Sequence, residues 1–308
     1  MPRLEPIKQI KLSKMSVDEL IRAFGKASSM GAGRLAEAVD IYEKMIRDRD
    51  CKIFFGIAGA MVPAGLRYVI HDVLINNWAD VFVCTGATLT HDLIEALGHK
   101  HYKGSPDLDD AWLNKLGLDR IYDSLMSNNV YPDLEKHVKR TVKKIPEQEM
   151  GISEFLRYYG KYSPKHSILR IAYEKEIPLF CPALQDCGFG IMVHYAIKQF
   201  GGPTINVFKD LDDIFDISWE AKKKGSVVVG GGVPKNFIMQ SFQFSPKPAD
   251  YGIQLTMDRP EPGGSSGAPP REAVSWGKFK PKASFVNVVS DATITFPIII
   301  AALKERLL

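Results

Sequence analysis

The stretch Ser226-Val-Val-Val-Gly-Gly-Gly-Val-Pro-Lys235 joins an apolar run to a glycine turn and then to a proline. A short, wholly apolar run is typical of a strand buried on both faces, as the central strands of a parallel sheet are. Pro234 stands where a helix would begin, and there its missing N–H is harmless. The stretch therefore predicts a central parallel strand that turns through residues 230–232 into a crossover helix.

The same order of apolar run, small-residue turn and helix recurs along the chain. We predict parallel strands at residues 52–58, 81–84, 178–181, 226–229, 251–257 and 284–289. We predict helices at residues 66–77, 91–97, 167–176, 190–199, 211–224 and 234–242. This alternation indicates an α/β fold, in which a doubly wound, Rossmann-like and mostly parallel sheet forms a single large domain over residues 51–308.

The flanking regions follow other patterns. Residues 1–50 are predicted to be a helical lead-in, extended over residues 1–14. Ser16 and Glu19 have the spacing of a capping box, which predicts a helix to about Phe24, then a loop over residues 25–33 and an amphipathic helix over 35–49. Residues 98–164 are less regular and are predicted to be an insertion with helices near 133–142 and 152–159. The C-terminal helix, from residue 291, is predicted to break at Pro297.

Composition narrows the class of protein. The 308 residues are 45% hydrophobic and carry a formal net charge of +4. The lysine-rich runs 222–224 and 139–144 are interpreted as solvated helix faces, so nucleic-acid binding is not favoured. The four cysteines lack CxxC spacing, which favours reduced thiols in a cytoplasmic protein over disulfides or a metal site. The N-terminal residues contain no apolar signal core, and the longest apolar run, 296–303, is too short to span a membrane.

Chemically reactive side chains gather after a loop that is too rich in glycine and proline for regular structure, residues 261–270. Glu272, Trp276 and Lys278 follow within a few residues. A neutral lysine amine attacks carbonyls and imines, and burial can lower its pKa enough to make it neutral. The indole can hold a cation against its face, and the carboxylate can anchor another. The other interpretation is a surface lysine beside a core tryptophan.

Several predicted strands end in small or polar residues, where open α/β sheets bind ligands. These ends are residues 56–59, 85–87, 230–232 and 290–292. Small residues let backbone N–H groups approach phosphates, and the helix that follows adds a favourable dipole. The GxGxxG fingerprint is absent, so the glycines fit a nucleotide, another small anion, or simple turns. Asp186, after the strand at 178–181, could accept hydrogen bonds from a ribose or cap the next helix.

The run Glu272-Ala-Val-Ser-Trp-Gly-Lys278 resembles the catalytic stretch of deoxyhypusine synthases, in which the lysine of Ser-Trp-Gly-Lys carries the covalent intermediate. Residues 80–92, 167–190, 227–235 and 291–297 resemble further blocks of that family in the same order, so the resemblance covers roughly residues 50–300. It implies Lys278 as the catalytic residue. It implies substrate-binding roles for Glu272, Trp276, His91, Asn236, Gly263 and Gly264, and NAD-binding roles for Thr85, Gly86, Asp186, Gly231, Gly232, Asp291 and Ala292.

The resemblance also implies a reaction. Members oxidise spermidine with NAD, capture the aminobutyl group on the lysine as an imine, and pass it to an acceptor amine. In deoxyhypusine synthase the acceptor is a lysine of the translation factor 5A precursor, and in related homospermidine synthases it is putrescine. A polyamine substrate, the factor 5A precursor as a partner and a homotetramer are therefore expected.

The sequence departs from the family where amines are anchored. Two acids of the family are replaced by Thr90 and His91, an aspartate by Ile191, and a histidine by Asn236, and the glycine loop differs at Ser265. These changes remove carboxylates that offset the desolvation of a polyamine. They favour a changed substrate, which His91 and Asn236 could recognise. The alternatives are a small-polyamine enzyme of the homospermidine synthase type and a non-catalytic, NAD-binding regulatory protein on the same scaffold.

Overall fold

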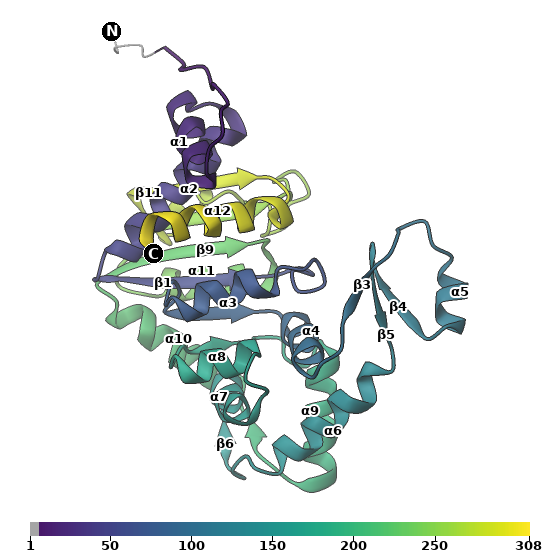
Figure 1. Ribbon diagram of the computed structural model, residues 1–308. Coiled ribbons are helices and arrows are strands. Elements are labelled where there is room, and N and C mark those ends of the chain that lie inside the picture. The colour runs from purple at the N-terminus through teal and green to yellow at the C-terminus, as the bar shows by residue number, and fades with distance from the viewer. Residues whose placement is uncertain (1–5) are drawn as a thin grey trace. The chain divides into compact units, whose positions relative to one another are not determined.

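The computed structural model describes residues 6–308, and the chain divides into two compact units. Unit 1 comprises the chain up to Ile57 together with Phe215–Leu308, and unit 2 comprises Ala58–Ile214. Figure 1 shows the elements of both. The predicted extended start lies outside the described residues over 1–5 and carries no regular element over residues 6–14.

Unit 1 is built on parallel strands in the order β11-β10-β9-β1. They are β1 (Cys51–Ile57), β9 (Lys223–Val229), β10 (Ala249–Thr256) and β11 (Phe279–Val289). Successive side chains of a strand point to opposite faces. Phe54 packs edge-on against Phe242 of α11 (Gly232–Gln243), with ring centroids 5.0 Å apart, and Phe55 meets Phe296 of α12 (Ala292–Leu307) at 5.8 Å. Helices therefore cover both faces of this sheet.

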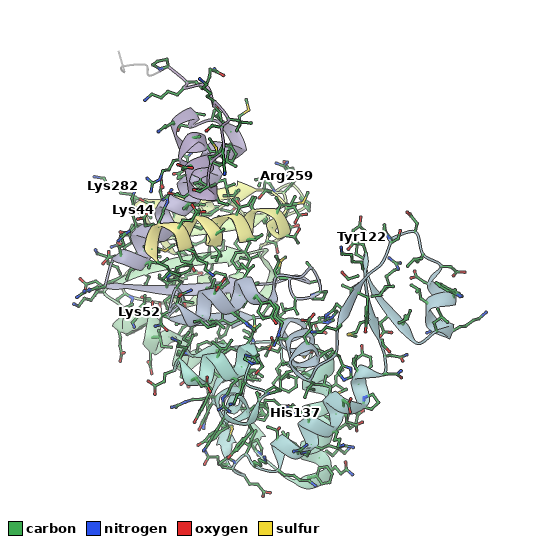
Figure 2. The ribbon with its side chains drawn as sticks, viewed as in Figure 1. Lys44, Lys52, Tyr122, His137, Arg259 and Lys282 are labelled. Carbon is green, nitrogen blue, oxygen red and sulfur yellow. The ribbon has the colours of Figure 1, made fainter. Side chains whose placement is uncertain are left out.

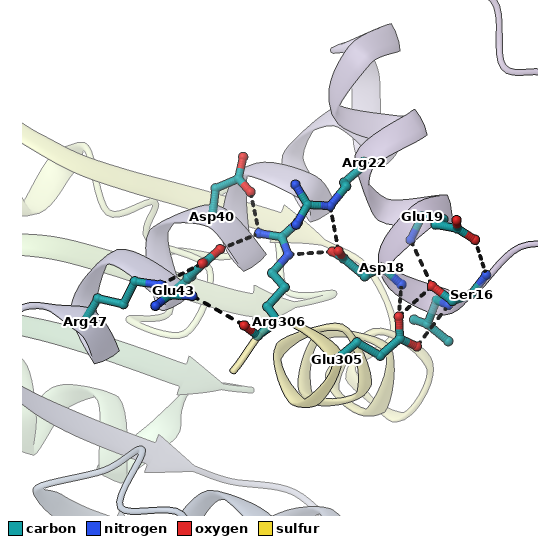
Figure 3. Close-up of polar contacts among 10 residues, drawn as sticks. Ser16, Asp18, Glu19, Arg22, Asp40, Glu43, Arg47, Glu305 and Arg306 are labelled. Carbon is teal, nitrogen blue, oxygen red and sulfur yellow. Dashed lines mark hydrogen bonds and ion pairs between the residues drawn. The ribbon is translucent and has the colours of Figure 1, made fainter. Parts of the chain in front are cut away.

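The N-terminal helices of unit 1 are tied to its last helix by Arg306 (Figure 3). These are α1 (Val17–Ala27) and α2 (Met30–Arg47). The Arg306 guanidinium donates to Asp18 of α1 and, from Nη1, to Asp40 and Glu43 of α2 at 2.8 and 2.9 Å. Its side chain is only 4% exposed. The neighbouring Glu305 accepts from the first backbone N–H groups of α1, so the end of the chain also caps its first helix.

Unit 2 pairs β2 (Val81–Cys84) in parallel with β7 (Leu179–Phe180) and β6 (Glu149–Met150) with β8 (Thr204–Ile205). Its longer helices are α3 (Arg67–Ile75), α4 (Gly86–Ala96), α6 (Val130–Val142), α7 (Ile152–Tyr162), α8 (Ile168–Glu174) and α9 (Gly188–Phe200). An antiparallel sheet, β3 (His101–Lys103), β5 (Ser124–Ser127) and β4 (Leu118–Ile121), carries the short α5 (Asp110–Lys115) between β3 and β4 (Figure 1). Tyr122 lies exposed in the β4–β5 turn (Figure 2).

The predicted α/β class with a mostly parallel sheet is confirmed, and each of the six predicted strands is present. The capping box of Ser16 and Glu19 is also present. The boundary predicted near residue 50, between a lead-in and a single domain, stays a prediction. Within the described residues, none of the helices combines the length and the apolar character needed to cross a bilayer.

Several element predictions are wrong. Residues 25–33 are mostly helical, because α1 runs to Ala27 and α2 begins at Met30. The helix predicted at 91–97 begins earlier, because residues 86–90 already belong to α4, where the Thr90 hydroxyl bonds back to the Gly86 carbonyl. The helix α12 continues through Pro297 in its second turn, where one missing N–H does not end it. The antiparallel sheet of unit 2 was not predicted, because its strands are too short for a clear alternation.

The run 222–224 is also not a solvated helix face. The helix α10 (Lys209–Glu220) ends before it, and β9 begins at Lys223. Lys224 is fully buried, with Nζ 3.2 Å from both the carbonyl and the hydroxyl oxygen of Ser218. Burial lowers its pKa to about 8. A charged residue appears in a buried strand here because neighbouring polar groups satisfy its ammonium group.

Replacing Arg306 by methionine should lower the free energy of unfolding by about 2 kcal/mol, because three carboxylates lose their common partner. Burial raises the pKa values of Asp18 and Glu43, but hydrogen bonds from arginines outweigh this and lower both. The stability they contribute is therefore present above their unfolded values and lost as pH falls through the lowered ones. Denaturant unfolding at pH 7 and pH 3 measures this.

Lys139→Met is the matched control, since Lys139 pairs with Glu135 one turn away on α6, outside this cluster. It should change stability little at either pH. A loss from Arg306→Met that stays equally large at pH 3 would contradict an electrostatic role for this cluster.

Candidate active site

A pocket of about 490 Å³ lies in unit 1 between α11, the strands β9 and β10, and residues 260–279. Six predicted site residues line it, although they come from three separate stretches of sequence: Asn236, Gly263, Gly264, Glu272, Trp276 and Lys278. Asn236 extends from α11, the two glycines come from the irregular loop, and the other three follow that loop. The structure therefore brings together the predicted nucleophile and most of the residues predicted to bind substrate.

The backbone around Lys278 is held on both sides. The short helix η1 (Glu272–Val274) is followed by a turn in which Gly277 has φ +71°, a conformation that favours glycine. The Lys278 N–H donates to the Ala273 carbonyl at 3.0 Å, and its carbonyl accepts from the N–H of Ala249 in β10 at 2.9 Å. β11 starts at the next residue, five positions earlier than predicted. Lys278 is thus fixed in the bend that leads from the loop into β11.

The amine of Lys278 lies beside an aromatic face and a carboxylate. Its Nζ is 5.2 Å from the centroid of the Trp276 ring. Partial burial lowers the pKa of Lys278, while the charge of Glu272 acts in the opposite direction. Trp276 is 57% exposed and so is not a core residue, which contradicts the interpretation of a surface lysine beside a core tryptophan. The arrangement supplies a neutral amine more readily than an exposed lysine would.

A second lysine holds the wall of the pocket. Lys235, near the start of α11, is only 7% exposed. Its Nζ donates to the carbonyls of Ser265, Ser266 and Ala268 at 2.7, 3.4 and 2.6 Å. Burial lowers its pKa to about 8, helped by the charge of Lys278 and opposed by Glu272. One ammonium group therefore satisfies three carbonyls of a loop that has no regular hydrogen bonding of its own.

The same loop is also anchored on β10 and on the glycine turn. Gln254, buried in β10, donates from Nε2 to the carbonyls of Ser266 at 2.7 Å and of Gly230 at 3.0 Å. The Ser266 hydroxyl accepts from the N–H of Gly232 at 2.7 Å. Ser266 approaches Gly231 so closely that a Cβ there would lie 2.6 Å from its side chain, so only glycine fits. Sequence analysis gave Lys235 and Gln254 no role, because nothing local in the sequence shows that a distant loop will need donors.

Comparison with known proteins identifies the family of the chain. The family model for deoxyhypusine synthase matches residues 19–303. A Methanosarcina acetivorans protein named "Probable deoxyhypusine synthase 1" is 44% identical over 98% of this chain and 95% of its own length. A protein of the same name from Archaeoglobus fulgidus is 38% identical over 95% of each chain.

The chain belongs to the deoxyhypusine synthase family. A solved structure described as a deoxyhypusine synthase from Entamoeba histolytica has the same fold, with a TM-score of 0.62 over 94% of this chain and 93% of that one, at 16% identity. The predicted family and the prediction of an enzyme of the transferase class are confirmed.

The residues predicted to bind the family's cofactor lie at strand ends in both units. In unit 1, Gly231 and Gly232 follow β9, and Asp291 and Ala292 follow β11. The Asp291 carboxylate accepts from the N–H and hydroxyl of Thr293, both at 2.8 Å, so it caps α12. In unit 2, Thr85 and Gly86 begin α4, and the exposed Asp186 follows β7.

The alternative role predicted for Asp186, capping the next helix, is wrong. Cys187 occupies the cap position of α9, and its Sγ accepts from the N–H of Gly190 at 3.2 Å. Asp186 is exposed, and no side-chain bond of its carboxylate occurs among the described residues. It therefore stays available to a ligand.

Positions at which the chain departs from the family behave differently from one another. The Thr90 hydroxyl bonds to the Gly86 carbonyl at 3.0 Å and accepts from the Phe189 N–H at 3.2 Å, so it joins α4 to α9. Ile191 is 50% exposed on α9. His91 lies in unit 2, where its ring contacts His101. Thr90 is buried and Ile191 has no polar side-chain atom, whereas His91 is partly exposed and has a ring nitrogen that can accept from an amine.

Glu272→Gln should lower the pKa of Lys278 further, because it removes the charge that raises it. The neutral fraction of the Lys278 amine should then rise at a given pH. We expect amine-directed modification of Lys278 at pH 8, followed by mass spectrometry of its peptide, to become about two- to threefold faster. Glu261→Gln, an exposed change outside the pocket lining, is the control. Slower modification in Glu272→Gln alone would contradict the electrostatic assignment.

Lys235→Met should release the loop over residues 260–270, since three carbonyls lose their donor. Hydrogen exchange should speed up at least tenfold at the backbone amides of this loop, with the helices α1 and α2 unaffected. Lys282→Met, at an exposed position on β11, is the matched control. Unchanged exchange in the loop would show that Gln254 and Ser266 suffice to hold it.

Proposed function

We propose that the chain is an NAD-dependent aminobutyl transferase of the deoxyhypusine synthase type, with Lys278 as the residue that carries the transferred group. The observation that carries the proposal is the contrast between the two lysines of the pocket. Lys235 commits its ammonium to three carbonyls. Lys278 makes no side-chain hydrogen bond within residues 6–308, and burial lowers its pKa. Only Lys278 is free to act as a nucleophile.

The residues of the pocket account for the central steps of transfer. Oxidation of the polyamine beside its secondary nitrogen gives an imine. The neutral Nζ of Lys278 adds to the imine carbon, diaminopropane leaves with the nitrogen electron pair and a proton, and Lys278 retains the four-carbon group as its own imine. The acceptor amine adds to the same carbon and expels Lys278. Trp276 covers the apolar methylenes or an ammonium, and Glu272 pairs with a charged end of the amine.

The strand ends fit the cofactor that this chemistry needs. The helices α4 and α11 each begin after a parallel strand, with glycine in the first turn and no cap from the N-cap residue itself, although the Gly232 N–H of α11 donates to the Ser266 hydroxyl. Such termini suit phosphate groups, and the exposed Asp186 suits a ribose hydroxyl. We propose NAD-binding roles for Gly231, Gly232, Asp291 and Ala292 in unit 1, and for Thr85, Gly86 and Asp186 in unit 2. The cofactor would supply the hydride acceptor for the amine and return the hydride at the end.

The acceptor decides between two forms of this activity. The lysine of the translation factor 5A precursor is our first proposal, since the family is named for that product. A small amine is the second, favoured by the loss of amine-anchoring acids at Thr90, His91 and Ile191. A homotetramer and a cytoplasmic location are part of the proposal for either form.

Lys278→Ala should reduce aminobutyl transfer at least a thousandfold and leave NAD binding unchanged, because the nucleophile is removed while the proposed cofactor residues remain. With NAD and spermidine, borohydride should trap an adduct on Lys278 of the parent, visible by peptide mass. Lys282→Ala is the control and should behave as the parent. Equal transfer by the Lys278→Ala protein would contradict the assignment.

The same incubations separate the candidate functions. Diaminopropane released only when the translation factor 5A precursor is present indicates deoxyhypusine synthase. A new polyamine from spermidine and putrescine alone indicates the homospermidine type. NAD binding with no adduct from spermidine, putrescine or agmatine indicates a non-catalytic binding protein.

A further inference from the structure

Three side chains of unit 2 form a hydrogen-bonded chain that ends at His91. His91 and Glu95 lie one turn apart on the same face of α4, and β3 begins at His101, shortly after that helix ends. His101 Nδ1 is 2.8 Å from Glu95 Oε1, and His101 Nε2 is 2.9 Å from His91 Nδ1. The His101 side chain is 5% exposed and that of Glu95 18% exposed. Water therefore competes little for the inner bonds.

The order of donors and acceptors from Glu95 through His101 to His91 determines which ring nitrogens carry protons. A carboxylate only accepts, so Glu95 requires a proton on His101 Nδ1. In a neutral imidazole the other nitrogen is then an acceptor, so His101 Nε2 accepts from His91 Nδ1–H. The Nε2 of His91 in turn carries a lone pair and no proton. This nitrogen has no hydrogen-bond partner within residues 6–308, and the His91 ring is partly exposed.

We propose that Glu95 and His101 are positioning residues that hold His91 in the Nδ1–H tautomer, so that its Nε2 is a neutral acceptor for the ammonium group of an amine ligand. This proposal concerns how the proposed transferase would recognise an amine. It rests on the proposed function only for the choice of an amine as the ligand. The resemblance to the deoxyhypusine synthase family assigns no role to Glu95 or His101.

The surroundings of His91 suit a cation. Burial lowers the pKa of His91 to about 4, so the ring is uncharged near neutral pH and does not repel an ammonium. A ligand carbonyl or phosphate oxygen would face a lone pair rather than a proton at Nε2. The adjacent Thr90, which also stands in place of a family acid, is committed to the backbone of α4 and α9. His91 is therefore the one of the pair that can contact an amine.

The tautomer can be measured directly in the full-length protein. Ring ¹⁵N NMR at pH 8, above the ordinary imidazole range of about 6.5, should show His91 with a protonated Nδ1 and an unprotonated Nε2, assigned by comparison with His91→Gln. In Glu95→Gln the amide can donate to His101 instead, so the Nε2–H form of His91 should rise. His101→Phe removes the acceptor and should do the same. His99→Phe is the control, since His99 pairs with Asp133 and takes no part in the hydrogen bonds between Glu95, His101 and His91.

The second arm uses n-butylammonium as the probe and n-butanol as its uncharged counterpart. Butylammonium should shift the His91 Nε2 resonance of the parent, with about tenfold weaker binding in Glu95→Gln and His101→Phe, whereas n-butanol should cause no such shift. A parent His91 already protonated at Nε2, or equal shifts in the parent and Glu95→Gln, would overturn the proposal.

The two proposals fail separately. An Nε2–H tautomer of His91 together with a trapped Lys278 adduct would overturn the proposed role of Glu95 and His101 and support the transferase activity. The expected tautomer and ammonium shift, with no Lys278 adduct, would support the proposed role of Glu95 and His101 and overturn the transferase activity.

Discussion

The Lys235 ammonium is the interaction on which the pocket of unit 1 depends. The loop from residue 257 to 271 contains too much glycine and proline to satisfy its own carbonyls in a helix or a strand. An exposed loop of this kind would turn those carbonyls to water. Here three of them converge on one buried cation, and Gln254 serves one of them again. The loop thereby becomes a fixed wall, and the turn that positions Lys278 follows directly from it.

Burying Lys235 has a consequence for its neighbour. Two lysines that share one pocket repel each other, which contributes to the low pKa of Lys235. The carbonyls of the loop stabilise the charge on Lys235, whereas Lys278 has an aromatic face and a single nearby carboxylate. Burial lowers the pKa of both lysines, so what separates them is that three carbonyls hold the Lys235 amine whereas none within residues 6–308 holds the Lys278 amine. The structure separates two identical side chains by the acceptors it gives each one.

Sequence patterns predicted what depends on local chemistry. The apolar runs at residues 52–58 and 226–229 predicted strands of a parallel sheet, and the Ser16–Glu19 spacing predicted a helix start, because burial and capping leave a local signature. The patterns were wrong where distant groups decide the outcome. The sequence predicts an exposed Lys224, because it does not show that Ser218 will accept its hydrogen bonds. It predicts a helix break at Pro297, although the contacts of Arg306 and Phe296 hold α12 in place. Six pocket residues were predicted together from the family resemblance, but the two that hold the loop, Lys235 and Gln254, contact residues 12 to 33 positions away in sequence and left no local sign.

The exchange of carboxylates for other groups changes how this chain can recognise an amine. A carboxylate attracts a cation strongly but must lose much hydration when it is buried. The neutral acceptor proposed at His91 loses less hydration and gives a hydrogen bond to a charged donor, worth about 1.5–3 kcal/mol. Such an acceptor depends on direction rather than on charge, so it needs a fixed tautomer and a fixed ring, and the bonds through His101 to Glu95 supply both. Two side chains, His101 and His91, separate the Glu95 carboxylate from the ligand, so it orders the acceptor without having to be desolvated against the amine. A site of this kind distinguishes amines by where their N–H groups point more than by how many charges they carry.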